Sequence, residues 1–320
     1  MKSPHPGASR LTQGLVLGIA IALVAWLAST TASHLAERGI RSGFDFLLEP
    51  AGFAIGETPI AFSDRDVVLR AFAVGLLNTL RVALPAAALA LALGVGLGLA
   101  RLSSNPLARG LAGAYVNLFR NIPLLLQLLT WYFVLTDLLP AVDAALRLAP
   151  GVFLSKSGLA LPWWGDEGLE IPALAGFGVE GGARLTPEYL TMLAGLSLYA
   201  AAYIAETLRG AVEALPVGQR LSALALGMSP RQAFVLVLLP QAWRAALPPV
   251  TSQILNLFKN ASLAVAIGYP DLVSVAGTTL NQTGRAIECL SIVIAVYLAL
   301  SLATAALGHR LETLSLRGRE

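Results

Sequence analysis

Long apolar stretches alternate with short polar stretches along most of the chain. A helix needs about 20 mostly apolar residues to cross the hydrocarbon core of a membrane, and about six stretches meet this requirement. They lie near residues 14–32, 75–100, 111–137, 188–208, 246–269 and 287–308. The pattern predicts an all-α membrane protein with about six transmembrane helices.

Two of these stretches carry polar or helix-breaking residues. Arg70, Asn78, Thr79 and Arg81 make the beginning of the second stretch amphipathic, which favours a helix that lies along the membrane surface before it turns in. Pro123, in the third stretch, removes a helical N–H group and frees a carbonyl, so it permits a kink. The run GVGLGLA from Gly94 predicts a close contact between helices.

The connections differ in charge, and this difference predicts the orientation. If the N-terminus is cytoplasmic, the cytoplasmic connections contain 11 basic and 3 acidic residues, and the opposite connections contain 7 basic and 12 acidic residues. Retained Lys and Arg mark the cytoplasmic side, so both termini should be cytoplasmic. The first stretch has an alternative interpretation as a cleaved signal peptide, with Lys2 and Arg10 as the basic region before it and the small residues 28–33 as the exit at its end.

The longest outer connection runs from Pro140 to Pro187. It carries Trp163, Trp164 and many glycine and proline residues, which predicts an ordered or interfacial cap without a catalytic signature.

Composition supports a membrane protein and excludes several activities. Hydrophobic residues make up 56% of the chain, charged residues 13%, and the mean hydropathy is +0.70, too few polar groups for a soluble globule of this size. The pI near 9.2 comes from scattered basic residues, so topology explains it better than nucleic acid does. The only cysteine, Cys289, allows no intrachain disulfide.

No residues form a recognisable catalytic or cofactor site. The lysines are Lys2, Lys156 and Lys259, and the chain has no P-loop sequence with which to bind ATP itself. The histidines are far apart and lack metal-site spacing, and no G-x-S-x-G sequence is present. We therefore expect no enzymatic activity, no metal and no cofactor.

The segment LSALALGMSPRQAFVLVLLP, from Leu221 to Pro240, interrupts two membrane-length stretches. Gly227 suits a left-handed position after a short helix, and Ser229 with Pro230 suits the start of the next one. The segment therefore predicts two short helices joined by a sharp turn. Its mixed polar and apolar residues fit either a groove on a partner protein or lipid headgroups.

This segment resembles the cytoplasmic loop of the membrane subunits of binding-protein-dependent ABC importers. The resemblance rests on Gly218, Gln219, Ala223, Gly227 and the final Leu239–Pro240 pair, although Leu221 and Ser222 replace the Glu-Ala pair that begins the family's motif. In that family the loop is the coupling helix that docks on the cytoplasmic ATPase. The resemblance implies coupling roles for Gly218, Ala223, Gly227, Ser229, Pro230, Arg231 and Pro240.

The resemblance extends along nearly the whole chain. NLFRNIPLLLQLLTWYFVL from Asn117, LYAAAYIAETLRGAV from Leu198 and NLFKNASLAVAIGYPDL from Asn256 are similar to segments of the polar amino-acid uptake branch. The segment SGFDFLLEPAGFAIGETPI from Ser42 is similar to the general L-amino acid permease subunits.

This resemblance implies a fold, a domain division and partners. The fold is a type I ABC importer-like transmembrane domain over residues 68–320, with a coupling loop at 209–245, preceded by a transmembrane helix and a periplasmic segment over 1–67. The implied partners are cytoplasmic ATP-binding subunits, a second related permease in a heterodimer, a periplasmic amino-acid-binding protein and the lipid bilayer of a bacterial inner membrane.

Charges inside the predicted spans are the candidates for a substrate pathway. Arg120, Glu206 and Lys259 lie within spans, where a lone charge costs at least about 2.5 kcal/mol, and we expect all three in the cytoplasmic half. Either Glu206 neutralises Arg120 or Lys259 in a structural pair, or one cation receives a substrate carboxylate. The candidate pathway residues are Arg120, Gln127, Glu206, Asn256, Lys259 and Asn260.

Two other functional classes remain open at this point. A self-sufficient secondary transporter needs coupling-ion sites and often has internal repeats, and the chain shows no clear repeat and few acidic residues inside its spans. A membrane scaffold or sensor could use the loop at 209–244 to dock a signalling partner, but six spans exceed what an anchor requires.

Overall fold

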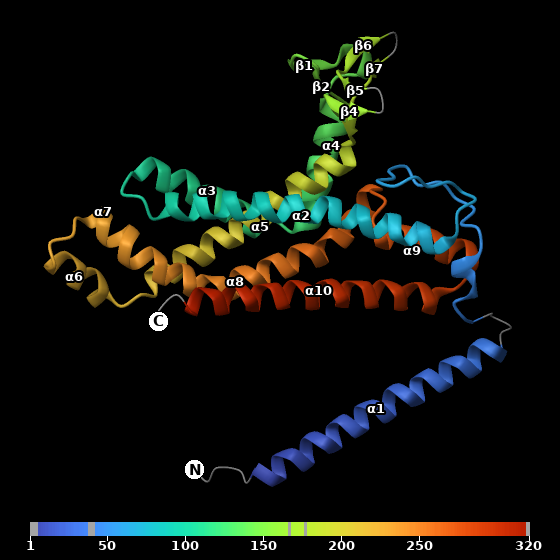
Figure 1. Ribbon diagram of the computed structural model, residues 1–320, viewed down its shortest axis with the longest axis horizontal. Helices are drawn as coiled ribbons and strands as arrows, with labels where there is room; N and C mark the ends of the chain where they lie inside the picture. Colours follow the sequence, from blue (N-terminus) through green and yellow to red (C-terminus); the bar gives the residue numbers. More distant parts are fainter. Residues whose placement is uncertain (1–5, 38–41, 166–167, 176–177, 318–320) are drawn as a thin grey trace.

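A computed structural model describes residues 6–37, 42–165, 168–175 and 178–317. Most of this part of the chain is helical (Figure 1). The α-helices are α1 (Pro6–Glu37), α2 (Val68–Arg101), α3 (Pro106–Asn121), α4 (Leu124–Phe133), α5 (Pro187–Glu213), α6 (Val217–Ala225), α7 (Pro230–Gln232), α8 (Leu239–Asn260), α9 (Leu272–Thr283) and α10 (Ala286–Arg317). Shorter 3-10 and π turns are η1 (Asp45–Leu48), η2 (Val134–Leu138), η3 (Val142–Ala144), η4 (Ala233–Leu238) and η5 (Ala261–Ile267).

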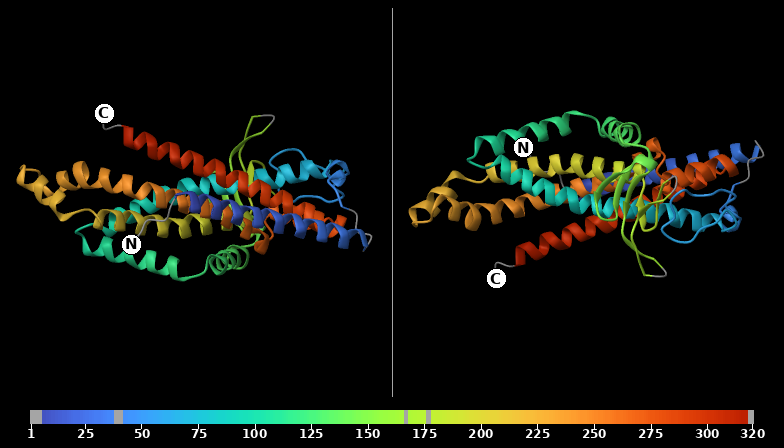
Figure 2. Two further views of the ribbon diagram at one scale, coloured as in Figure 1. Left: turned by 90° about the horizontal axis from the view of Figure 1, so that it is seen from below. Right: turned by 90° about the horizontal axis from the view of Figure 1, so that it is seen from above.

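Four long helices, α2, α5, α8 and α10, form the body of the molecule (Figures 1 and 2). The segment α6–α7 lies at one end of this body, which we call the loop end. At the other end, residues 42–67 run along α2 and α9 without long regular structure. We call residues 42–67 the strap and this end the strap end.

The closest packing in the body joins α2 to α5, and glycine makes it possible. A Cβ atom added at Gly94 would lie 2.7 Å from Ile204, and one added at Gly98 would lie 3.1 Å from the Ala205 carbonyl oxygen. The two backbones approach closely only because these side chains are absent. The prediction of a close helix contact along this run is confirmed.

The described residues contain four helices long and apolar enough to cross a membrane, or five if the bent pair α3 and α4 is one span. The sequence predicted about six. The third predicted span bends by 103° between Asn121 and Leu124, at the proline that was expected to permit a kink. In α1 the apolar stretch is Thr12–Leu27, shorter than the predicted span.

The predicted surface-lying start of the second span is wrong. Helix α2 is continuous from Val68, and Asn78 and Thr79 are fully buried. Their polar groups are satisfied inside the protein, because Asn78 Nδ2 donates to the carbonyl oxygens of Glu57 and Pro270 at 2.9 Å each. Asn78, which suggested a helix on the membrane surface, instead joins α2 to Glu57 and Pro270 by hydrogen bonds.

The outer connection folds into short strands that the sequence analysis did not predict. They are β1 (Leu146–Ala149), β2 (Val152–Ser155), β3 (Gly158–Leu161), β4 (Trp163–Gly165), β5 (Gly168–Glu170), β6 (Ala173–Ala175), β7 (Gly178–Glu180) and β8 (Ala183–Leu185). One sheet has the antiparallel order β1-β2-β3-β8, and β4-β5 and β6-β7 are separate hairpins. This cap projects sideways from the helical body beyond α4 (Figure 1).

Candidate functional site

The loop end has the turn geometry that its sequence predicts. Gly227 adopts φ +82°, its N–H donates to the Leu224 carbonyl, and the Met228 N–H donates to the Ala223 carbonyl. This pair of bonds is a Schellman motif, which ends α6 with a left-handed residue. The turn therefore redirects the chain at Gly227.

The next helix begins with a reciprocal cap. The Ser229 hydroxyl accepts from the Gln232 N–H at 3.3 Å, and Gln232 Oε1 accepts from the Ser229 N–H at 2.8 Å. Pro230 occupies the first helical position, where a missing N–H is harmless. Ser229 and Pro230 lie where the sequence predicts them, and the capping contact of Gln232 was not predicted.

The two short helices present apolar residues at the surface. Ala223 is buried where α6 meets η4, and Gly218, Arg231 and Pro240 are exposed. Val217, Leu221, Leu226 and Leu236 are each at least 60% exposed. An exposed set of this kind at the tip of a loop is typical of a helix that docks on another protein.

A cluster of charges lies where α2, α3 and α5 come together towards the loop end. Glu206 forms an ion pair with Arg101, and Arg209 Nη2 lies 2.7 Å from Glu206 Oε1. Arg120 Nη1 is more distant, at 3.8 Å from the same oxygen. The expected pairing of Glu206 with Arg120 is therefore present but weak, and Arg101 and Arg209 satisfy the carboxylate more closely.

Arg120 is the least engaged of these three guanidinium groups. Its side chain is 38% exposed and lies over the Tyr203 ring, with 5.3 Å from Cζ to the ring centre. It lines a groove of about 490 Å³ between α5 and α8, together with Glu206, Pro249 and Gln253. Since three arginines surround Glu206 and Glu213, this end of the groove has one excess positive charge.

The predicted asparagines continue this surface. Asn256 and Asn260 line a smaller hollow with Tyr199, and Gln253 belongs to both the hollow and the larger groove. We call the two together the polar groove. It joins Arg120, Glu206, Asn256 and Asn260, four of the six residues predicted for a pathway.

Gln127 does not line the polar groove, which corrects its predicted place. Its side chain is 5% exposed, and Nε2 donates to the carbonyl oxygens of Phe119 at 2.9 Å and Ile122 at 2.8 Å. Phe119 lies four residues before Pro123, so its carbonyl is the one that the proline leaves without a helical donor. Gln127 holds the bend between α3 and α4 by replacing that donor.

Lys259 also lies apart from the polar groove. It is exposed in a separate groove of about 470 Å³ between α8, α9 and α10, beside Ser262, Val273 and Tyr297. No ion pair joins its ammonium group to an acidic residue in the part of the chain that the structure describes. The expected pairing of Lys259 with Glu206 is absent, because the two side chains line different grooves.

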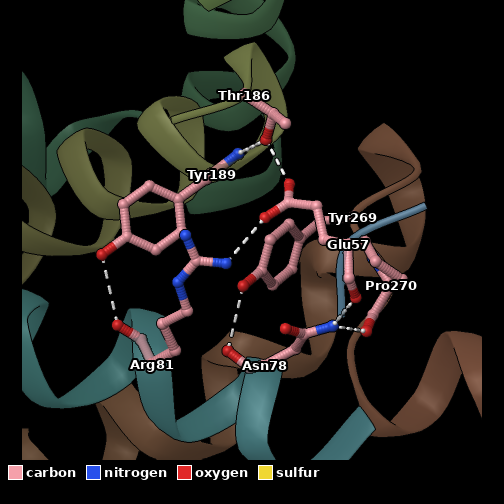
Figure 3. Close-up of polar contacts among 7 residues, drawn as sticks. All are labelled: Glu57, Asn78, Arg81, Thr186, Tyr189, Tyr269 and Pro270. Carbon is pink, nitrogen blue, oxygen red and sulfur yellow. Dashed lines mark hydrogen bonds and ion pairs between the residues drawn. The ribbon is translucent and has the colours of Figure 1, made fainter. Parts of the chain in front are cut away.

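A second polar cluster, at the strap end, was not predicted from the sequence (Figure 3). Glu57 Oε2 lies 3.1 Å from Arg81 Nη1, and the Thr186 hydroxyl donates to the other carboxylate oxygen. The Arg81 guanidinium lies over the Tyr189 ring, 5.0 Å from its centre. These contacts join the strap to α2 and to the beginning of α5.

Burial dominates the electrostatics of this cluster. Desolvation raises the pKa of the Glu57 carboxyl above its usual value, although Thr186 and Arg81 lower it. Nearby, Asp271 is fully buried and accepts from the Ser274 N–H at 2.8 Å as the N-cap of α9. Burial raises the pKa of Asp271 to about 6. Glu57 thus joins the strap to α2 and α5, and Asp271 caps the beginning of α9.

Comparisons with known proteins agree with this architecture. A family described as binding-protein-dependent transport system inner membrane component matches residues 90–313. The chain is 38% identical to the putative amino-acid ABC transporter permease protein YhdX of Escherichia coli K12, over 91% of this chain and 90% of that protein. It is 36% identical to the general L-amino acid transport system permease protein AapQ of Rhizobium johnstonii, over 91% and 88%.

Solved structures show a similar fold. A crystal structure of an amino acid ABC transporter with histidines superposes with a TM-score of 0.58 at 24% identity, covering 77% of this chain and 94% of that one. An inward-facing MetNI methionine ABC transporter gives 0.53 at 17% identity, covering 77% and 97%.

Proposed function

Because the chain belongs to the family of binding-protein-dependent transport system inner membrane components, we propose that it is a permease subunit that passes amino acids into the cytoplasm. In this proposal the energy comes from ATP hydrolysis on a partner subunit, and the chain itself catalyses no reaction. The observation that carries the proposal is the near full-length similarity to amino-acid permeases. The capped, exposed loop at one end of the body is a second observation that supports it.

The loop end is the proposed contact with the ATPase. Leu221 and Leu226 expose apolar side chains on α6 and just beyond it, and the Gly227 turn and the Ser229 cap hold α6 and α7 in a fixed relation. A rigid two-helix tip transmits a movement of its partner to the α8 helix that follows it. Gly218, Ala223, Pro230, Arg231 and Pro240 take part in this role as elements of the same tip.

The polar groove is the proposed route of the substrate. Amino acids carry a carboxylate that a guanidinium group can bind. The Arg120 guanidinium is partly exposed, and its ion pair with Glu206 is long, at 3.8 Å. Asn256 and Asn260 extend a hydrogen-bonding surface along α8. Inward transport needs a site whose affinity differs between two states, and a groove open along one side of the subunit is completed only when a second permease covers it.

The orientation follows from the charge distribution. The loop end carries Arg209, Arg220, Arg231 and Arg244, whereas acidic residues predominate in the strap and the cap. With Lys and Arg retained inside, the loop end and both termini are cytoplasmic, and the strap and the cap face the periplasm of a bacterial inner membrane. A periplasmic amino-acid-binding protein then delivers substrate at the strap end.

Isolation of the tagged chain from its native membrane tests this assembly. We expect an ATP-binding subunit and a second permease to be recovered with it, in a complex whose ATP hydrolysis increases when amino-acid-loaded binding protein is added. Recovery of the chain alone, able to move solute on an ion gradient, would establish a secondary transporter. Recovery with a signalling protein and no solute flux would establish a scaffold.

A further inference from the structure

Helix α1 is an apolar helix without a packing partner in the described structure. Leu15, Ile19, Ile21 and Trp26 are each at least 60% exposed, and in Figure 1 the helix lies apart from the body on the side of α10. Its small residues form a stripe at helical spacing. The stripe consists of Gly14, Gly18, Ala22, Ala25 and Ser29.

The body has a groove between α8, α9 and α10. Lys259 and Ser262 form one wall of this groove, Val273 belongs to α9, and Ile294, Tyr297 and Leu298 of α10 form the other wall. Ile294 and Leu298 are more than half exposed. Tyr297 lies about 16 Å of helix rise from the beginning of α10, so the groove is deep within the membrane-spanning part of the helix.

A charge at this depth requires cover. The Lys259 ammonium has no acidic partner among the described residues, and most of the groove around it is apolar. A lone charge in a membrane span normally faces a partner or a cavity, because hydrocarbon does not solvate it. An occupant of the groove should therefore be apolar on most of its surface and polar near Lys259.

The strap limits where α1 can pack. Gly43 N–H donates to Glu288 Oε1 at 2.8 Å, and Arg285 Nη2 lies 3.1 Å from Asp45 Oδ1. These contacts fix the beginning of the strap against the beginning of α10. Six residue steps separate Gly43 from Glu37, so the end of α1 lies within about 20 Å of that point.

Counting from these neighbouring ends aligns the two helices antiparallel. Residues at equal distance from Glu37 in α1 and from Ala286 in α10 then lie side by side. On this count Trp26 lies beside Tyr297, and Ser29 lies beside Ile294. Ala25 and Ala22 then face Leu298 and Ser301. Ala25 and Ser29 of the stripe therefore meet the exposed Leu298 and Ile294 of α10. Trp26 lies level with Tyr297, which lines the same groove as Lys259.

We propose that α1 docks in the groove between α8, α9 and α10, with its small-residue stripe against α10. Trp26 and Ser29 cover the Lys259 ammonium through a cation–π contact and a hydroxyl group. The small stripe permits the close approach that stabilises helix pairs in lipid. The N-terminal helix is then part of the subunit's own helix bundle, not a free anchor.

Disulfide cross-linking in the assembled complex in its membrane tests this docking. Cys289 is the only cysteine, so Cys289→Ala gives a clean background. The pairs Ala25→Cys with Leu298→Cys and Ala22→Cys with Ser301→Cys place thiols on the facing stripes, where oxidation joins residues whose Cα atoms lie within about 7 Å. Leu27→Cys with Leu298→Cys is the matched control, because Leu27 lies about 200° around α1 from Ala25.

Oxidation followed by digestion and mass spectrometry identifies the linked peptides. We expect both facing pairs to form a bridge within one chain, at a yield several-fold above the control. The proposal is overturned if neither facing pair exceeds the control, which would leave lipid in the groove. It is also overturned if the bridges join two copies of the chain, or if α1 is absent from the mature protein. None of these outcomes depends on transport activity.

Discussion

Substitution of Gly227 tests whether the left-handed backbone of the turn is needed, apart from any effect of a larger side chain at the surface. Gly227→Ala adds one methyl group at φ +82°, a conformation that L side chains rarely adopt. A Cβ atom there meets nothing within 4 Å, so steric contact contributes nothing. The matched variant Gly218→Ala adds the same methyl group to the same loop, inside α6 and also with nothing within 4 Å.

The expected effects of the two variants have opposite signs. A left-handed conformation costs an alanine about 1 kcal/mol, and the turn's two hydrogen bonds form only with residue 227 in that conformation. This cost makes opening of the turn about fivefold more frequent. Gly218→Ala should instead stabilise α6 by up to about 1 kcal/mol, because alanine is the better helix former.

Hydrogen–deuterium exchange of residues 217–232 measures opening directly, and ATP-driven uptake measures its consequence. Gly227→Ala should exchange about fivefold faster at the Met228 amide, which bonds to the Ala223 carbonyl, and should reduce uptake. Gly218→Ala should exchange at the original rate or more slowly. Equal acceleration in both variants would contradict this prediction, since the faster exchange would then come from the added methyl group and not from the left-handed conformation of the turn.

Three further predictions concern the bend, the strap end and the polar groove. Gln127→Leu leaves the Phe119 and Ile122 carbonyls without their donor and should destabilise the protein by about 1–3 kcal/mol in thermal denaturation, whereas an unchanged midpoint would mean that the bend does not need it. Because burial raises the pKa of Asp271 from 3.8 to about 6, the folded state binds its proton more tightly than the unfolded state, and the free energy of unfolding should fall by about 2 kcal/mol as pH rises from 4 to 6. Asp271→Asn should lose that dependence, and a pH-independent difference between variant and parent would contradict it. Arg120→Gln should lower amino-acid uptake while the complex assembles normally; loss of the assembled complex would assign Arg120 a structural role instead.

Features of the loop end could be predicted from sequence because they depend on neighbouring residues. A left-handed glycine and a Ser-Pro helix start act over a few positions, and both lie where they were expected. The strands of the cap are local too, but each is only three or four residues long, too short for an alternating pattern to distinguish them from loop.

The candidate site was less predictable because its contacts join distant parts of the chain. Arg101 and Glu206 lie 105 residues apart, and no sequence pattern links them, so Arg120 or Lys259 was expected to be the partner of Glu206. Gln127 was placed in the pathway for its polarity, although the carbonyl freed by Pro123 needed a donor at that distance. The Glu57–Arg81 pair was missed because the strap gives no periodic signal for the helix face that it meets.

The proposed function makes the claim that ATP hydrolysis on a partner subunit drives amino acids inward through this chain. The most direct test is uptake by the purified complex in liposomes, with labelled amino acid and loaded binding protein outside and ATP inside. We expect accumulation only when ATP and the binding protein are both present, with no effect of collapsing ion gradients. Accumulation without ATP that depends on an ion gradient would contradict the claim.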